Sequence, residues 1–261
     1  MVLFPRQRKT FYSIRKRGIA LTNTVMEVSQ ITKTIGKRTI IHESSFQLET
    51  GKIYGFIGPN GAGKTTLMRI MTGLIQPTSG EVRIDSYHIK TQRQQAIARV
   101  GAIIESPIFF EYMTGRQVLR NLSRLHPTIK SAQREEHIEK LLTTVGLEKR
   151  GNDKVRTYSL GMKQRLGIAQ SMLGRPKLLL LDEPSNGLDP LGMRELRDII
   201  ITLRESENLA FFISSHLLDE LQQMCDELII IREGSIIWKG PKENIVKDGQ
   251  RLEDAFVELV Q

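Results

Sequence analysis

The sequence is poor in the residues that would cross-link the protein or place it inside a membrane. Cys225 is the single cysteine, which excludes an intrachain disulfide. No apolar run approaches the roughly 18 residues that a membrane-spanning helix requires. The longest runs, such as KLLLL and LAFFI, have the length of buried strands. The basic start also lacks the apolar segment of a signal peptide. These absences predict a protein of a reducing compartment without a membrane span of its own.

Acidic side chains are absent from the first 26 residues, and this absence accounts for most of the net charge of +9. The basic residues ahead of Glu27 are Arg6, Arg8, Lys9, Arg15, Lys16 and Arg17. Because the rest of the chain is close to neutral, a nucleic-acid-binding groove is not expected. The basic N-terminal extension, residues 1–25, either rests on anionic lipid head groups or is a leader ahead of a true start at Met26.

The hydrophobic content of 39% and charged content of 26% suit a globular protein with a core. Strand and helix patterns alternate at both ends of the chain, which predicts a parallel α/β core. The expected strands are 52–57, 81–84, 177–182, 209–214 and 227–231. The expected helices are 66–75, 115–125, 131–145, 191–204 and 217–224. A two-residue hairpin turn is expected at Glu233-Gly234. Residues 106–170 interrupt the alternation and predict an inserted helical subdomain.

A phosphate-binding loop lies between the first predicted strand and helix. Its spacing is G-x-x-x-x-G-K-[ST], in the context that supports nucleotide binding. The loop consists of Gly58, Pro59, Asn60, Gly61, Ala62, Gly63, Lys64, Thr65 and Thr66. Glycines let backbone N–H groups wrap the phosphates. Lys64 is expected to reach the β- and γ-phosphates, and the Thr65 hydroxyl is expected to ligate Mg²⁺.

A second part of the site follows the apolar run LLLL, residues 178–181. A buried strand here delivers Asp182 to the carboxyl edge of the sheet, where α/β proteins bind ligands. We expect Asp182 to hold Mg²⁺, directly or through water. Glu183 is then placed to act as the general base that polarises the attacking water.

The stretch YSLGMKQR, residues 158–165, is a second candidate anion site. Ser159 is a good N-cap, and a helix N-terminus with serine and glycine attracts phosphate. The alternative is an ordinary capped helix. Because the chain already has a phosphate loop, a second such element makes sense if it closes on the nucleotide held by another copy of the protein.

Over residues 26–240 these motifs, in this order, resemble the ATP-binding subunits of ABC transporters. The segment that resembles the family's signature is Ser159, Leu160, Gly161, Met162 and Lys163. The loop that resembles the one crossing the dimer interface is Asn186, Gly187, Leu188 and Asp189. His216 stands where the family has its switch histidine, and Glu105 stands where it has its glutamine loop.

The resemblance implies an α/β fold: a P-loop NTPase core of ABC ATPase type with an inserted helical subdomain and an antiparallel β subdomain. It implies ATP and Mg²⁺ as cofactors, with Lys64, Glu183 and His216 as catalytic residues and Thr65, Asp182 and Glu105 as ligands of the metal. Two copies would meet head to tail, each closing its signature on the partner's ATP. A separate polytopic permease would hold the dimer at the cytoplasmic face of the cell membrane as a peripheral subunit. No nucleic-acid partner is expected.

The chain departs from the family pattern at several positions. Leu160 and Met162 replace a glycine and a glutamine of the signature, so we expect function with altered closure. Glu105 adds a negative charge beside the triphosphate. Ile35 stands where an aromatic would stack on adenine, which predicts loose base selectivity.

The Glu105-Ser-Pro segment and the C-terminal tail resemble one branch, the exporters that give resistance or immunity to bacitracin and lantibiotics. The tail, residues 241–261, has an apolar stripe at Leu252, Ala255, Phe256 and Leu259, which either docks on its own domain or contacts a partner. We expect the permease near 106–125, where Phe109, Phe110 and Tyr112 are contact or core residues. The alternative functions are an ABC-type ATPase that regulates a non-transporting membrane complex and a soluble one that acts on ribosomes or DNA.

Overall fold

The computed structural model describes residues 23–126, 128–246 and 249–260, so most of the basic extension lies outside the described residues. The strands are β1 (Thr24–Ile35), β2 (Arg38–Glu49), β3 (Ile53–Ile57), β4 (Ser79–Ile84), β5 (Tyr87–His88), β6 (Val100–Ile103), β7 (Leu178–Asp182), β8 (Ala210–Ser214), β9 (Glu227–Arg232) and β10 (Ser235–Pro241). The α-helices are α1 (Lys64–Met71), α2 (Arg93–Ile97), α3 (Gly115–Ser123), α4 (Arg134–Thr144), α5 (Leu160–Ser171), α6 (Pro190–Glu207), α7 (Leu218–Met224) and α8 (Leu252–Val260). Short 3-10 turns lie at Ser131–Gln133, Val155–Thr157 and Lys242–Asn244.

The central sheet has the strand order β10-β9-β3-β8-β7-β6. Its strands from β9 to β6 are parallel, and only β10 at one edge pairs antiparallel to its neighbour. Every residue of β3, β7 and β8 is buried. A parallel strand covered on both faces needs such a continuous apolar run. The predicted parallel α/β core is therefore confirmed.

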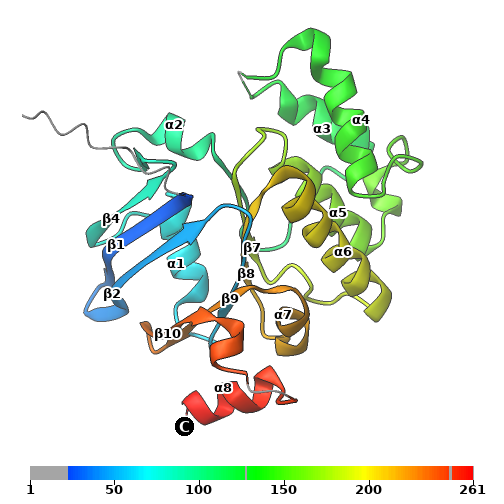
Figure 1. The fold of residues 1–261 in the computed structure, drawn as a ribbon. Coiled ribbons are helices and arrows are strands. Elements are labelled where there is room, and N and C mark those ends of the chain that lie inside the picture. Colours follow the sequence, from blue (N-terminus) through cyan, green and yellow to red (C-terminus); the bar gives the residue numbers. More distant parts are fainter. Residues whose placement is uncertain (1–22, 127, 247–248, 261) are drawn as a thin grey trace, which may run out of the picture.

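Alternate side chains of the central sheet enter two different cores, as the two-residue period of a strand requires. In β7, Leu179 and Leu181 pack with the apolar residues of α3, α4 and α5. Leu178 and Leu180 pack with those of α1 and the second sheet. The central sheet thus separates the inserted helices from the β-rich side of the molecule (Figure 1).

The second sheet is antiparallel, with the order β2-β1-β4-β5, which confirms the predicted antiparallel β subdomain. Aromatic rings join it to the central sheet. Phe212 of β8 stacks on Phe46 of β2 with ring centroids 6.1 Å apart, and Phe56 of β3 lies 4.9 Å from the same ring. All three rings are buried, so Phe212 lies at the centre of the joint between the sheets.

The inserted helices fold as a group on the opposite side of the central sheet (Figure 1). Thr114 caps α3 through a capping box with Gln117. The apolar side of α4 and its C-cap is buried; it comprises Ile138, Leu141, Leu142 and Val145. The predicted helix 66–75 is shorter than expected: α1 ends at Met71, and Gly73 follows with a φ of 66°.

The C-terminal region lies against its own domain. The hairpin turn between β9 and β10 is confirmed, with Glu233 and Gly234 at φ of 48° and 78°. Helix α8 packs against α7, with Leu252 and Ala255 buried. Leu259 departs from the predicted stripe, since 37% of it is exposed. The expectation that the tail docks on its own domain is confirmed for the described residues.

Replacing Phe212 by alanine tests the joint between the sheets. We expect the free energy of unfolding to fall by about 3–5 kcal/mol, because a buried aromatic side chain is lost and a cavity remains. Urea denaturation measures the change. The control is Phe110→Ala, at a residue that is 65% exposed. The control should stay within about 0.5 kcal/mol of the parent. Equal losses in the two variants would contradict the packing described.

Candidate nucleotide-binding site

The predicted phosphate loop connects the end of β3 to the start of α1. Gly61 and Gly63 have φ of 78° and 105°, a backbone region that glycine adopts readily. A Cβ atom on Gly58 would lie 2.4 Å from the carbonyl oxygen of Ile231. The first N–H groups of α1 have no partner within the helix, and no side chain caps them. The loop thus has the shape and the donors that a phosphate group needs.

Lys64 lies inside this loop and is 7% exposed. Its Nζ donates to the carbonyl oxygens of Gly58 at 2.6 Å and Pro59 at 3.3 Å. Burial lowers the pKa of Lys64, and the charges of Glu183 and Asp182 partly oppose that shift. The ammonium group is therefore held among carbonyl oxygens near two carboxylates, where phosphate oxygens would be stronger partners.

Asp182 connects the loop to the central sheet. The Thr65 hydroxyl donates to Asp182 Oδ2 at 2.9 Å, and the Ser214 hydroxyl donates to Asp182 Oδ1 at 2.5 Å. A hydroxyl and a carboxylate oxygen at this separation are hard ligands of the kind that Mg²⁺ takes together with water and phosphate oxygens. Among the described residues, no group of three or more His, Cys, Asp or Glu could hold a metal by itself. The donor set fits a nucleotide-borne Mg²⁺ better than a metal caged by protein alone.

Glu183 and His216, both predicted as catalytic residues, lie next to each other. Glu183 Oε2 lies 2.5 Å from His216 Nδ1, and both side chains reach solvent. The Glu183 backbone has a φ of 48°, unusual for a residue with a side chain. Its N–H donates to the carbonyl oxygen and the hydroxyl of Ser214, at 3.1 and 2.9 Å. The chain thus holds a carboxylate at the edge of the site, next to a histidine.

Glu105 is not brought to Thr65 and Asp182 in this structure. Its carboxylate pairs with Arg69 of α1, and its side chain is 64% exposed. Arg69 stands one helical turn beyond Thr65, on the same face of α1. Glu105 therefore lies on the same side of α1 as Thr65, paired with a cation. Its role as a metal ligand stays a prediction.

The predicted signature segment forms the start of α5. Ser159 is its N-cap, and the Ser159 hydroxyl accepts from the Met162 N–H at 3.2 Å. Leu160 is 46% exposed, and a Cβ on Gly161 would meet no atom closer than 3.8 Å. Among the described residues, no hydrogen bond or ion pair joins Ser159–Lys163 to the chain's own phosphate loop. This helix start therefore faces outward.

The predicted interface loop lies beside the signature segment of the same chain. A Cβ on Gly187 would come 3.1 Å from the Leu160 side chain, and Leu188 is the nearest neighbour of Gly161. Asp189 caps α6, with its carboxylate accepting from the Gly192 N–H at 3.1 Å. The four residues 186–189 and the signature thus form one surface.

The sequence patterns do not predict two residues of the site, Ser214 and Gln164. Ser214 contacts both Asp182 and Glu183, although its only sequence signal is its position just before Ser215-His216. Gln164 is buried in α5 and donates from Nε2 to the carbonyl oxygen of Pro184 at 3.0 Å. Its only signal is its place at the end of YSLGMKQR.

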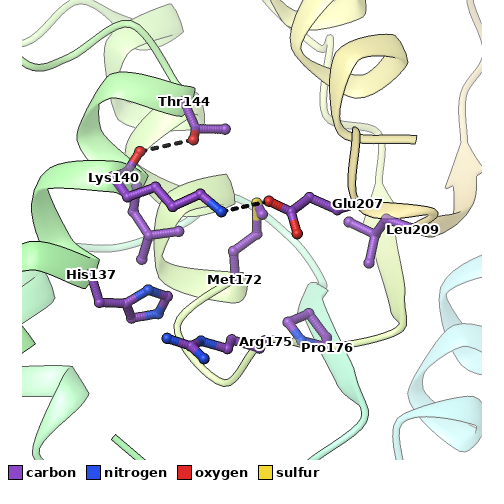
Figure 2. Close-up of a pocket in the computed structure, with 9 residues that line it drawn as sticks. His137, Lys140, Thr144, Met172, Arg175, Pro176, Glu207 and Leu209 are labelled. Carbon is purple, nitrogen blue, oxygen red and sulfur yellow. Dashed lines mark hydrogen bonds and ion pairs between the residues drawn. The ribbon is translucent and has the colours of Figure 1, made fainter. Parts of the chain in front are cut away.

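A cavity of about 410 Å³ lies away from this site, between α4, the turn before β7 and the end of α6. Lys140 and Glu207 form an ion pair of 2.8 Å across it, and His137 and Arg175 lie below that pair (Figure 2). No residue of the phosphate loop lines this cavity. This cavity and the candidate nucleotide site are therefore separate.

Known proteins resemble this chain in sequence and in fold. A family model described as ABC transporter matches residues 41–186. The ABC transporter ATP-binding protein YhcH of Bacillus subtilis, itself described as uncharacterized, is 45% identical over 82% of this chain and 69% of its own. The bacitracin transport ATP-binding protein BcrA of Bacillus licheniformis is 38% identical over 88% of this chain and 74% of its own. The lantibiotic transport ATP-binding protein SrtF of Streptococcus pyogenes is 40% identical over 89% and 96%.

A solved structure described as the ATP binding subunit of an ABC transporter superposes with a TM-score of 0.80. It is 27% identical to this chain and covers 91% of this chain and 100% of its own. The fold and the order of motifs in the present chain are therefore those of an ATP-binding cassette.

Replacing Glu183 by glutamine tests the chemistry of the site. Glutamine keeps the side chain's size and removes its ability to accept a proton. We expect ATP binding to be retained and the turnover number to fall by about 100-fold or more, the contribution of a general base. Phosphate release and equilibrium nucleotide binding give the two readouts. Glu233→Gln, at the exposed turn between β9 and β10, is the matched control and should keep the parent's rate. Normal turnover in Glu183→Gln would refute the role.

Proposed function

We infer the function of this chain from one premise: it belongs to the ABC transporter family, as an ATP-binding subunit that hydrolyses ATP. We propose that it powers a membrane export complex for antimicrobial peptides such as bacitracin or lantibiotics, and so confers resistance or immunity. The observation that carries this proposal is that the predicted hydrolysis residues Lys64, Thr65, Asp182, Glu183 and His216 lie near one another in a chain 38–40% identical to the bacitracin and lantibiotic transport subunits named above.

The ATP site of the proposal uses the residues as the structure arranges them. The loop 58–66 wraps the phosphates, and Lys64 exchanges its carbonyl partners for phosphate oxygens. Thr65 and Asp182 hold the Mg²⁺ that accompanies ATP. Glu183 accepts a proton from the attacking water, and His216 stabilises the charge beside it through their 2.5 Å contact. Removing a proton from the water as it attacks lowers the barrier to hydrolysis.

A second copy completes each site in this proposal. Ser159 is exposed, a Cβ on Gly161 would meet no atom closer than 3.8 Å, and among the described residues neither forms a hydrogen bond with the chain's own phosphate loop. When two copies meet head to tail, the start of α5 in one copy covers the nucleotide of the other. A helix N-terminus stabilises a negative charge by about 0.3–1 kcal/mol or more when partly buried. ATP binding would therefore close the dimer, and hydrolysis would reopen it.

A separate permease provides the transport path. No helix among the described residues is long and apolar enough to cross a bilayer. The segment after Glu105 exposes apolar side chains: Ile108 is 96% exposed, Phe110 65% and Tyr112 67%. Phe109, by contrast, is partly buried against the core. We propose that Ile108, Phe110 and Tyr112 contact the permease, which places the chain at the cytoplasmic face of the membrane as a peripheral subunit.

A second function is compatible with the same ATP-driven closure of the dimer. An ABC-type ATPase could drive a membrane complex that transports nothing, because ATP-driven closure is identical in both cases. A soluble ATPase acting on ribosomes or DNA receives less support, since the exposed apolar segment 108–112 has no basic residue to contact nucleic acid.

Affinity purification of the Glu183→Gln variant with ATP and Mg²⁺ tests this proposal. The trapped dimer is expected to recover a polytopic membrane protein from solubilised membranes. The variant that also carries Phe110→Ala and Tyr112→Ala should still bind ATP but lose that partner. Recovery of ribosomes or nucleic acid without a membrane protein would overturn the export function in favour of the soluble alternative.

A further inference from the structure

We propose that Gln164 is a positioning residue that holds the Glu183 loop in place from helix α5. The inference deepens the proposed function, because it rests on Glu183 as the general base. It assigns a role to a residue of the YSLGMKQR stretch that neither phosphate binding nor helix capping uses. Gln164 lies one turn beyond the Ser159 cap, on the helix whose start is proposed to cover the partner's ATP.

The contact itself is buried and directional. Gln164 is 4% exposed, and its Nε2 donates to the Pro184 carbonyl oxygen at 3.0 Å. The reversed amide would set its own oxygen against that carbonyl, two acceptors without a proton between them. The orientation with Nε2 toward Pro184 is therefore the one that forms a bond. Pro184 directly follows Glu183, so the bond restrains the peptide next to the general base.

Glu183 is restrained from two sides, and Gln164 provides one of them. On the N-terminal side, the Glu183 N–H donates to Ser214 of β8. On the C-terminal side, the bonds from Asn186 to Glu183 and from Leu188 to Ser185 shape the loop without tying it to another element. Gln164 ties it to α5. A glutamate with a φ of 48° keeps that backbone only where its surroundings hold it.

The other end of the Gln164 amide points to a functional reason for the residue. Gln164 Oε1 is buried without a hydrogen-bond partner among the described residues. A buried unpaired oxygen is unfavourable for stability. Methionine has a similar length and would fill the same space with no such oxygen. A glutamine at this position is therefore better explained by the bond to Pro184 than by packing.

The bond also joins the two segments of one chain that take part in the proposed cycle of dimer closure and ATP hydrolysis, the helix α5 and the Glu183 loop. The start of α5 responds to the partner's nucleotide, whereas Glu183 acts on the chain's own nucleotide. Because Gln164 connects the helix to the loop, a shift of α5 on closure moves the Pro184 carbonyl and with it the Glu183 backbone. Hydrolysis would then depend on closure even when ATP is already bound.

The test compares Gln164→Met with Gln170→Met, the same substitution on the same helix at a side chain that forms no hydrogen bond among the described residues. We expect Gln164→Met to keep the parent's thermal unfolding midpoint and ATP affinity while its turnover number falls about tenfold. Gln170→Met should match the parent in all three. A fall in ATP affinity or unfolding midpoint that accounts for the lost turnover, or an unchanged turnover number, would overturn the proposal.

A double-mutant cycle separates this role from a general structural one. If Gln164 acts through Glu183, adding Gln164→Met to Glu183→Gln should cause no further loss in single-turnover hydrolysis. A further tenfold loss would show that Gln164 acts elsewhere and overturn the inference. The proposed function fails separately: it is contradicted if Glu183→Gln alone keeps the parent's rate. A Glu183→Gln variant that is inactive beside a fully active Gln164→Met would remove only the role of Gln164.

Discussion

The buried carboxylate of Asp182 is the contact on which the rest of the site depends. It is 9% exposed, and it accepts from Thr65 at the start of α1 and from Ser214 at the end of β8. A buried charge is costly unless hydrogen bonds compensate it. Asp182 therefore fixes three elements relative to one another: the strand that carries it, the helix after the phosphate loop and the neighbouring strand. Glu183 and His216 follow directly from the ends of two of these elements.

The fold supplies this arrangement because parallel strands end at the same edge of the sheet. β3, β7 and β8 are adjacent, and each is followed by a functional segment: the phosphate loop, Asp182-Glu183 and Ser214–His216. Ligands of open α/β sheets bind at this carboxyl edge. The helices α3 to α5 and the antiparallel sheet are packed on opposite faces, so the start of α5 can face a different nucleotide from the one bound by the chain's own loop.

Local patterns predict the parts of this structure that local physics determines. The phosphate loop, the buried strand before Asp182 and the hairpin at Glu233-Gly234 depend on neighbouring residues, and all are found where the sequence places them. The long strands β1 and β2 are harder to detect, because register shifts such as the one between Val28 and Ile31 break the two-residue alternation. The contact of Ser214 with Asp182 spans 32 residues of the sequence, and that of Gln164 with Pro184 spans 20. No motif or spacing in the sequence predicts either contact. Glu105 shows the same limit, since its pairing with Arg69 follows from tertiary contact.

The central claim is that ATP brings two copies together, and the mass of the Glu183→Gln variant in solution tests it most directly. Light scattering after size exclusion would compare the variant alone with the variant in saturating ATP and Mg²⁺. Without nucleotide we expect the mass of one chain, 29.7 kDa. With nucleotide we expect about twice that mass, since a closed two-fold dimer buries both sites. A variant that binds ATP yet keeps the mass of one chain would contradict the claim.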